Sequence, residues 1–369
     1  MKLKHFARDL GRCTYCPKLC RFCCPASEAE HAETVTPWFK MSLAEMLRLG
    51  RIEPAGEPAE TLYHCFACLH CRTHCRHGVD VPTALAAARA LVLRAGGEPD
   101  SVRELLARMR ASGNPWGEDL GSRLRDGLDA RFQVPEAQAV VFAGCRSARE
   151  PSVQLEPLFD LLEAVDVDYV GLAVEVEVCC GMPLWQAGDL EGFTAHARKV
   201  AAVLSRARTV ICPCPTCAYA LGTLYGLHDV RISARVLTAD AFLAGALADR
   251  NPARTLPGQY VFHDPCFQTR YLEQGDGPRQ LLAAVLESPL VEPEPWSGDD
   301  ASCCGGGGLV PYVLPEVAAQ AARIRMGQLA ATGAEKVASC CPGCAQQLGA
   351  VAGGLPVEDL IEILRRAYA

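Results

Sequence analysis

The stretch Cys303-Cys304-Gly305-Gly306-Gly307-Gly308 lies at the centre of a cysteine pattern that decides how this chain is organised. Cys266 precedes the cysteine pair by 36 intervening residues, and Cys341-Pro-Gly-Cys344 follows the pair after another 36. Five cysteines therefore surround a run of four glycines at regular spacing. Such a set of thiols, gathered from distant parts of the sequence, indicates a site rather than a structural accident.

The same pattern occurs once more upstream. Cys179-Cys180 is followed by Gly181, has Cys145 33 intervening residues before it, and has Cys214-Pro-Thr-Cys217 33 after it. The offset between the two copies drifts only from 121 residues at the first cysteine to 127 at the last. We interpret the two five-cysteine sets as a duplicated unit built around a cysteine site.

Composition limits the classes of protein that this chain can represent. With 369 residues, of which 50% are hydrophobic and 21% charged, it can bury a large core in two or three domains. The net charge of −7 argues against nucleic acid as a partner, because phosphate binding needs clustered Lys and Arg. The charged N-terminus contains no apolar signal segment, and no apolar run reaches membrane-spanning length. We therefore expect a cytoplasmic protein without a transmembrane segment of its own.

The 21 cysteines indicate metal binding rather than a disulfide framework. Disulfide-rich chains are typically short and secreted, whereas Cys-x-x-Cys clusters in a long chain without an export signal are typical of metal sites. The odd number would also leave at least one thiol unpaired in any disulfide scheme.

Two further cysteine runs lie near the N-terminus. The second of them has the C-x2-C-x2-C-x3-C spacing of bacterial ferredoxins, in which the fourth cysteine binds the neighbouring cluster. By that logic two [4Fe–4S] clusters would be bound by two quartets, one of Cys13, Cys16, Cys20 and Cys75 and the other of Cys65, Cys68, Cys71 and Cys24. The first run has one extra residue before Cys20 and offers Cys23 as an alternative ligand, and Arg76 stands where ferredoxins have proline. Structural zinc remains an alternative, because four thiolates also suit tetrahedral zinc. His64, His70 and His74 are expected on loop surfaces.

Hydrophobic periodicity predicts alternating strands and helices in both copies of the repeat. In the first copy we expect strands at 139–142, 169–170 and 209–211, and helices at 155–165 and 190–204. In the second copy we expect strands at 260–263 and 336–338, helices at 278–286 and 315–331, and a final amphipathic helix that includes Val357. Strand, crossover helix and strand form the unit of a parallel sheet. Before the repeat, helices are expected at 41–49, from Pro82 to Gly96, and over 100–128.

The predicted fold is α+β or α/β with three domains. A helical ferredoxin-type domain with its connector occupies 1–135, and two α/β cysteine-rich domains with short parallel sheets occupy 136–255 and 256–369. Parallel sheets bind ligands at the carboxyl ends of their strands. Cys145, Cys214, Cys266 and Cys341 all follow predicted strands. The glycines after each cysteine pair would let the backbone approach a bulky cofactor and donate N–H groups to sulfur.

The motifs resemble a known family. His263-Asp-Pro-Cys266, the Cys303-Cys-Gly-Gly-Gly-Gly308 run and Cys341-Pro-Gly-Cys344 are similar to the cysteine-rich domain of the heterodisulfide reductase catalytic subunit. The complete arrangement is equally similar to the iron–sulfur subunits of glycolate, lactate and anaerobic glycerol-3-phosphate oxidoreductases. The resemblance covers about residues 10 to 350.

This resemblance implies a cofactor set and a site. In heterodisulfide reductase each five-cysteine set binds a non-cubane [4Fe–4S] cluster, and two such clusters face each other across a disulfide-cleaving cleft, although many relatives bind an ordinary cubane instead. The corresponding ligands in this sequence are Cys145, Cys179, Cys180, Cys214 and Cys217 in the first copy, and Cys266, Cys303, Cys304, Cys341 and Cys344 in the second, with Gly181, Gly305 and Gly306 beside the cofactors.

Several nearby residues leave alternatives open. Cys212 and Cys340 are extra thiols, which we interpret as buried strand-end cysteines first and as alternative ligands second. His263 would protonate a leaving thiolate or would simply be a hydrogen-bonded residue at a strand end. Asp264 is expected to cap the turn that follows it rather than act as a base.

Two functions follow from the resemblance. In the first, electrons pass through the ferredoxin-type clusters to the paired clusters, where a disulfide or thiol substrate reacts. In the second, the chain is an electron conduit for a flavin-dependent dehydrogenase of a 2-hydroxy acid or glycerol 3-phosphate. Because the sequence has no dinucleotide fingerprint, any flavin is expected on a partner, either a flavoprotein or a quinone-reactive membrane subunit. A zinc-stabilised scaffold is the third alternative.

Overall fold

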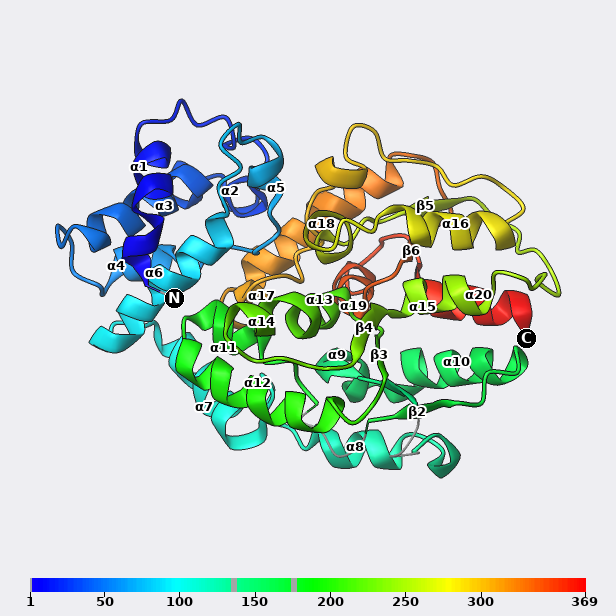
Figure 1. Ribbon diagram of the computed structural model, residues 1–369. Helices are drawn as coiled ribbons and strands as arrows, with labels where there is room; N and C mark the ends of the chain where they lie inside the picture. Colours follow the sequence, from blue (N-terminus) through cyan, green and yellow to red (C-terminus); the bar gives the residue numbers. More distant parts are fainter. Residues whose placement is uncertain (1, 134–137, 174–177) are drawn as a thin grey trace.

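The structure is a computed structural model that describes residues 2–133, 138–173 and 178–369. Figure 1 shows three regions in contact: N-terminal helices at one end, a first α/β repeat coloured green, and a second coloured yellow to red. The α/β fold with two short parallel sheets is as predicted. The predicted boundary at 135/136 lies outside the described residues, and the boundary at 255/256 stays a prediction.

The N-terminal region is helical. Its elements are η1 (Leu3–Phe6), α1 (Ala7–Thr14), α2 (Pro25–Glu30), η2 (Glu33–Val35), α3 (Pro37–Arg48), α4 (Glu57–Thr61), α5 (His70–Thr73), α6 (Val81–Ala95), α7 (Asp100–Ser112), α8 (Leu120–Asp126) and η3 (Ala130–Phe132). Helix α6 is confirmed, since Asp80 caps its N-terminus and left-handed Gly96 ends it. Helix α3 begins four residues before the predicted start, because Thr36 accepts a hydrogen bond from Phe39 N and Pro37 occupies the first turn.

The first repeat is a four-stranded parallel sheet in the order β2-β1-β3-β4. Its strands are β1 (Ala139–Val141), β2 (Val170–Leu172), β3 (Thr209–Cys212) and β4 (Arg235–Thr238). The accompanying helices are α9 (Gly144–Arg149), α10 (Pro151–Ala164), α11 (Met182–Ala187), α12 (Leu190–Leu204), α13 (Pro215–Tyr219), η4 (Ala220–Leu224), α14 (Tyr225–Leu227) and α15 (Ala239–Ala246). Strands β1 and β2 are buried throughout, as expected of a sheet covered on both faces.

The second repeat follows the same plan with a smaller sheet, β5-β6-β7, which is also parallel. Its elements are β5 (Tyr260–Phe262), η5 (Phe267–Tyr271), α16 (Asp276–Val285), η6 (Gly298–Asp300), α17 (Val310–Val313), α18 (Pro315–Ala330), β6 (Lys336–Ser339), α19 (Pro342–Gly349), β7 (Val357–Asp359) and α20 (Leu360–Tyr368). A single parallel bridge between Val261 and Val291 takes the place that β2 has in the first copy.

Two parts of the prediction need correction. Val357 belongs to β7 and not to the final helix, because Asp359 accepts a hydrogen bond from Ile361 N and starts α20 only at Leu360. Strand β4 and helix α15 were not predicted, since the strand Arg235-Val-Leu-Thr lies at the sheet edge and is only partly buried.

The hydrophobic core crosses the predicted domain boundaries. One buried cluster contains side chains of α6 together with α11 and α12 of the first repeat. A second contains β1 and α10 of the first repeat together with β5 and α20 of the second. The three regions therefore pack as one body, which holds the cysteine sets in fixed relative positions.

Candidate functional site

Both five-cysteine sets contribute cysteines to the wall of one cavity of about 90 Å³. The cysteines that line it are Cys145, Cys179, Cys180, Cys214 and Cys217 from the first repeat and Cys266, Cys304, Cys341 and Cys344 from the second. The lining is mostly apolar and sulfur, and its polar exceptions are Arg146, Gln186, Thr216 and Tyr312. Sites that are separated by more than a hundred residues in sequence thus share one pocket.

The strand ends explain this convergence. Cys214 is the N-cap of α13 after β3, and Cys341 is the N-cap of α19 after β6. Cys266 precedes η5 after β5, and Cys145 lies in the first turn of α9 after β1. All four cysteines lie between a strand and a helical segment, as predicted, at the carboxyl edge where parallel sheets bind ligands.

Backbone N–H groups of the glycines point at sulfur. Gly181 N donates to Cys179 Sγ at 3.4 Å, Gly305 N to Cys303 Sγ at 3.4 Å, and Gly306 N to Cys304 Sγ at 3.3 Å. These three bonds would stabilise negative charge on sulfur, which is the role the sequence predicted for these glycines.

A Cβ atom added at Gly307 or Gly308 would collide with the backbone of the ferredoxin-type loop. At Gly307 it would lie 2.4 Å from Phe66 O, and at Gly308 2.3 Å from Cys65 O. The glycine run therefore also lets the second repeat approach the ferredoxin-type loop closely, which sequence reasoning missed.

The thiols form a continuous series of contacts. From the N-terminal region inward the series runs through Cys68, Cys303, Cys304, Cys344, Cys341, Cys214, Cys217, Cys180, Cys179 and Cys145. Within it, the Sγ atoms of Cys304 and Cys344 lie 3.1 Å apart. Cys303 lies at the junction, because its thiol lies beside those of both Cys68 and Cys304.

The two predicted ferredoxin quartets are also brought together. Cys13, Cys16, Cys20 and Cys75 line one cavity, which Cys71 also reaches. Cys24, Cys65, Cys68 and Cys71 line another, and Cys23 lies beside them there. In the second loop Ala67 and Leu69 have φ of +52° and +58°, a conformation that costs energy without glycine and that clusters at functional sites.

The donor set fits iron–sulfur clusters. All 21 cysteines are free, so no disulfide consumes these thiols. Burial raises the pKa of Cys13 to about 12 and that of Cys266 to about 12, so isolated thiols at these positions would stay protonated at neutral pH. Thiolates buried together become favourable when they bind a cationic iron core, which displaces the protons. Cys212 and Cys340 are buried but do not line the shared cavity, consistent with the structural interpretation of both.

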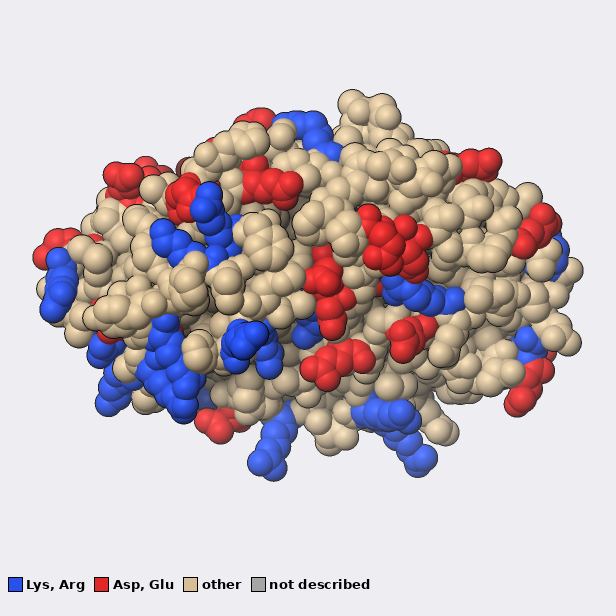
Figure 2. Space-filling view, turned by 90° about the horizontal axis from the view of Figure 1, so that it is seen from above, with Lys and Arg blue, Asp and Glu red and all other residues tan. Residues whose placement is uncertain are grey.

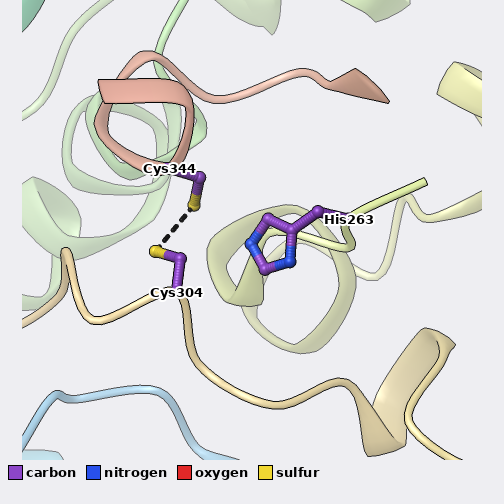
Figure 3. A group of neighbouring side chains, drawn as sticks. All are labelled: His263, Cys304 and Cys344. Carbon is purple, nitrogen blue, oxygen red and sulfur yellow. Dashed lines mark hydrogen bonds between the residues drawn. The ribbon is translucent and has the colours of Figure 1, made fainter. Parts of the chain in front are cut away.

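His263 faces the second cysteine set (Figure 3). Its ligating atoms and those of Cys304 and Cys344 lie within 4.8 Å of one another. Arg325 Nε donates to His263 Nδ1 at 3.2 Å, which leaves the ring proton on Nε2, and burial lowers the pKa of this histidine. The geometry thus supplies a neutral imidazole whose N–H faces sulfur.

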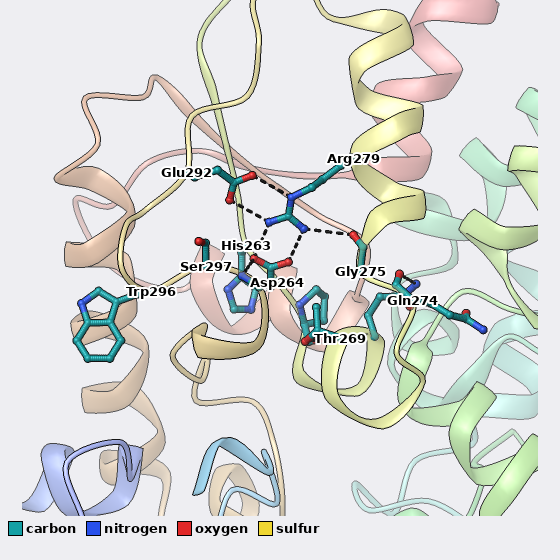
Figure 4. Close-up of polar contacts among 12 residues, drawn as sticks. His263, Asp264, Thr269, Gln274, Gly275, Arg279, Glu292, Trp296 and Ser297 are labelled. Carbon is teal, nitrogen blue, oxygen red and sulfur yellow. Dashed lines mark hydrogen bonds and ion pairs between the residues drawn. The ribbon is translucent and has the colours of Figure 1, made fainter. Parts of the chain in front are cut away.

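Asp264 has a different role from the predicted turn cap. It is buried and forms a two-pronged ion pair with Arg279, with distances of 2.6 and 2.9 Å, and also accepts from Gly298 N at 2.9 Å (Figure 4). Arg279 in turn holds Glu292 at 2.9 Å. This network fixes the loop that leads to Cys303 and keeps Asp264 away from the sulfur atoms.

The prediction that the three histidines near the second run lie on the surface is wrong for His70. His70 is only 1% exposed, and burial followed by the charge of Arg270 lowers its pKa to about 3. His64 pairs with Glu30 at 2.8 Å, and His74 is half-buried. None of the three lies among the thiols of the shared cavity.

Arg146 and Arg270 were missed from the sequence. Arg146 lines the shared cavity, where its guanidinium lies 3.3 Å from Tyr312 Oη and 3.4 Å from Gln346 Oε1. Buried Arg270 donates from Nε to Cys68 O at 2.6 Å, and its Nη2 atom has no hydrogen-bond partner among the described residues. The sequence signal that could have found them is proximity to the cysteine sets. Arg146 directly follows Cys145, and Arg270 lies four residues after Cys266.

Surface charge and hydropathy add two observations. Figure 2 shows acidic and basic side chains interspersed over the face in view. Within the described residues, no helix combines the length and hydrophobicity that crossing a bilayer requires.

The comparisons match this architecture. The model of the CCG cysteine-rich domain family matches residues 139–222 and 260–349. The "Probable membrane-anchored ferredoxin" of Chromohalobacter salexigens is 31% identical over 84% of this chain, which spans only 48% of that protein. A subunit of fumarate reductase (CoM/CoB) from Methanothermobacter marburgensis is 26% identical, over 95% of this chain and 71% of its own length. A subunit of dihydromethanophenazine:CoB–CoM heterodisulfide reductase from Methanosarcina mazei is 25% identical, over 84% of this chain and 78% of its own length.

Proposed function

We propose that this chain, which contains two CCG cysteine-rich domains and is similar to iron–sulfur subunits of oxidoreductases, transfers electrons to a disulfide or thiol substrate in the shared cavity. The observation that carries the proposal is that both cysteine sets line that one cavity. Clusters bound at these thiols would occupy part of this space in either function. The polar side chains of Arg146, Gln186 and Tyr312 on the same wall support a substrate site over simple relay.

The order of the thiols supports a path of transfer. Cys68 of the second ferredoxin-type quartet contacts Cys303 of the second repeat, and Cys341 of that repeat contacts Cys214 of the first. Electrons entering at the N-terminal region would reach the second repeat before the first. When bound at these cysteines, [4Fe–4S] clusters would supply one-electron transfer.

The chain's own residues would bind and protonate the substrate. Reductive cleavage of a disulfide consumes two electrons and two protons and yields two thiols. The Arg146 guanidinium and the Tyr312 hydroxyl face the cavity and would donate hydrogen bonds to a substrate. The apolar remainder of the wall would exclude water from the sulfur atoms.

Related subunits work in complexes, so we expect this chain to receive electrons from a partner protein, either a flavoprotein or a membrane quinone-reactive subunit. Co-purification of the native complex would identify it.

A direct test uses anaerobically purified, chemically reduced protein and a low-molecular-weight mixed disulfide. We expect the release of two thiols for every two electrons consumed, which is the stoichiometry of cleaving one disulfide. Cys304→Ser and Cys180→Ser should abolish release, and Cys340→Ser, which alters a buried thiol outside the cavity, should leave it intact. Absence of thiol release by the wild type across a panel of disulfides, with intact clusters, would contradict the proposal and leave the relay function.

A further inference from the structure

Two histidines and one carboxylate meet where the ferredoxin-type region contacts the second repeat, away from the shared cavity. His70 and His74 lie one helical turn apart at α5, and Asp300 lies in η6. The side chains of His70 and Trp296 meet edge to face, and Phe22 packs against His74 with ring centroids 4.7 Å apart. Aromatic rings therefore shelter the cluster of three.

The distances among the three polar atoms match a metal site. His74 Nε2 lies 3.1 Å from Asp300 Oδ1 and 3.4 Å from His70 Nε2, and His70 Nε2 lies 3.8 Å from Asp300 Oδ1. Ligands at about 2.0–2.1 Å from a tetrahedral zinc ion are separated by roughly 3.3–3.4 Å. An octahedral ion at a similar bond length would bring them to about 3.0 Å. The observed separations fit the tetrahedral case better.

Hydrogen bonding alone does not satisfy these atoms. Asp300 Oδ1 is buried and accepts no hydrogen bond from the described residues, even though His74 Nε2 lies 3.1 Å away. The Nε2 atoms of His70 and His74 face each other. A proton on one of these nitrogens can be donated either to the other nitrogen or to Asp300 Oδ1, so one of the two contacts stays without a hydrogen bond. A cation at their common focus would satisfy both nitrogens and the oxygen together.

We propose that His70, His74 and Asp300 bind one zinc ion, with water as the fourth ligand. Two imidazoles from one helical segment and a carboxylate from another are a common zinc donor set.

Such an ion would clamp two regions of the chain. Helical turn α5 carries Cys71 of the ferredoxin-type loop, whereas η6 directly precedes the Cys303-Cys304 pair. Thr73 Oγ1 already donates to Asp299 O at 3.5 Å across the same junction. Zinc would hold the Cys68–Cys303 contact in place, and this role does not depend on the substrate that the shared cavity takes.

The test uses iron–sulfur-loaded full-length protein that has been stripped with a chelator and titrated with zinc chloride. We expect one tightly bound zinc per chain. Its X-ray absorption spectrum should show nitrogen and oxygen ligands at about 2.0 Å and no sulfur at about 2.3 Å. His74→Gln and Asp300→Asn should each weaken zinc binding at least 10-fold, whereas His77→Gln, an exposed histidine of the same segment, should not.

Iron content and the visible spectrum verify that each variant retains its clusters. Asp300 is half-exposed and belongs to neither ferredoxin-type run, so its replacement is expected to leave iron binding unchanged. Zinc bound through sulfur, or equal zinc affinity in wild type, H74Q and D300N, would overturn the inference. The spectrum of the wild type decides the question even where a variant fails to fold.

Discussion

At the scale of single residues, the glycine run has two separate tasks. Gly305 and Gly306 donate N–H groups to the cysteine sulfurs, and Gly307 and Gly308 leave room for the backbone of Cys65 and Phe66. Sequence spacing pointed to the first task only. The second joins the second repeat to the ferredoxin-type loop, so the run serves the docking of these two regions as well as the cysteine site.

Gly307→Ala tests this close approach without backbone strain, because Gly307 is not among the residues with positive φ. The new methyl group would lie 2.4 Å from Phe66 O, so we expect a loss of about 1–3 kcal/mol in the free energy of unfolding. Gly327→Ala in α18 meets no atom within 4 Å and should be neutral or stabilising by about 0.5–1 kcal/mol. Denaturant unfolding of both variants checks the difference, and equal stabilities would refute the contact.

His263→Leu tests the N–H group that faces Cys304. Hydrogen bonds to cluster sulfurs raise reduction potentials, so we expect one cluster to become harder to reduce, by on the order of 50 mV. His263→Gln retains an N–H donor and should recover part of the shift. Electron paramagnetic resonance during a redox titration measures the shift, and a signal that does not move in H263L would show that this N–H group does not act on the cluster.

At the scale of elements, the strand ends place the thiols and the helix caps fix where each helix begins. Asp359 ends β7, caps α20 through Ile361 N at 2.9 Å, and accepts from Gln154 Nε2 at 2.9 Å. Burial raises the pKa of this carboxyl group to about 6 from its ordinary 3.8. The folded protein therefore binds this proton more tightly than the unfolded chain.

The raised pKa of Asp359 makes the stability of the folded protein depend on pH. Stabilisation from the protonated Asp359 is complete below pH 3.8 and is lost as the pH rises toward 6. The free energy of unfolding of Asp359→Asn minus that of the wild type should therefore be about 1 kcal/mol larger at pH 8 than at pH 5. Asp119→Asn, at an exposed cap where hydrogen bonds from Ser122 lower the pKa of the carboxyl group, should show no such change, because this group is ionised in both the folded and the unfolded state above pH 5. Denaturant unfolding of the holoprotein between pH 5 and pH 8 measures this difference. A difference between wild type and D359N that does not change with pH would contradict the raised pKa of Asp359.

The sequence was most informative where spacing and periodicity coincide. Cysteine order predicted which thiols converge, and apolar runs predicted β1, β3, β5 and β6, because buried parallel strands are hydrophobic throughout. Strand β4 and Val357 were misjudged, since an edge strand and a capped helix start carry weak local signals. Burial of His70 depends on Trp296, which is more than 200 residues away, and no local pattern reports such a contact.

At the scale of the whole molecule, the three regions pack as one body. Arg270 and Tyr271 of the second repeat bond to the carbonyls of Cys68 and Ala67, at 2.6 and 2.8 Å, and so anchor the ferredoxin-type loop. Hydrophobic clusters that cross the predicted boundaries hold the repeats together. The thiol series could not be predicted from spacing, because it depends on how the regions dock.

The most direct test of the account counts iron in anaerobically reconstituted protein and in two cavity variants. Four [4Fe–4S] clusters predict about sixteen iron atoms per chain in the wild type, and about twelve in Cys304→Ser and in Cys180→Ser. Cys212→Ser, at a buried cysteine that does not line the shared cavity, should keep the full number. A wild type with about eight iron atoms, unchanged in C304S and C180S, would contradict the claim that the two cysteine sets hold clusters.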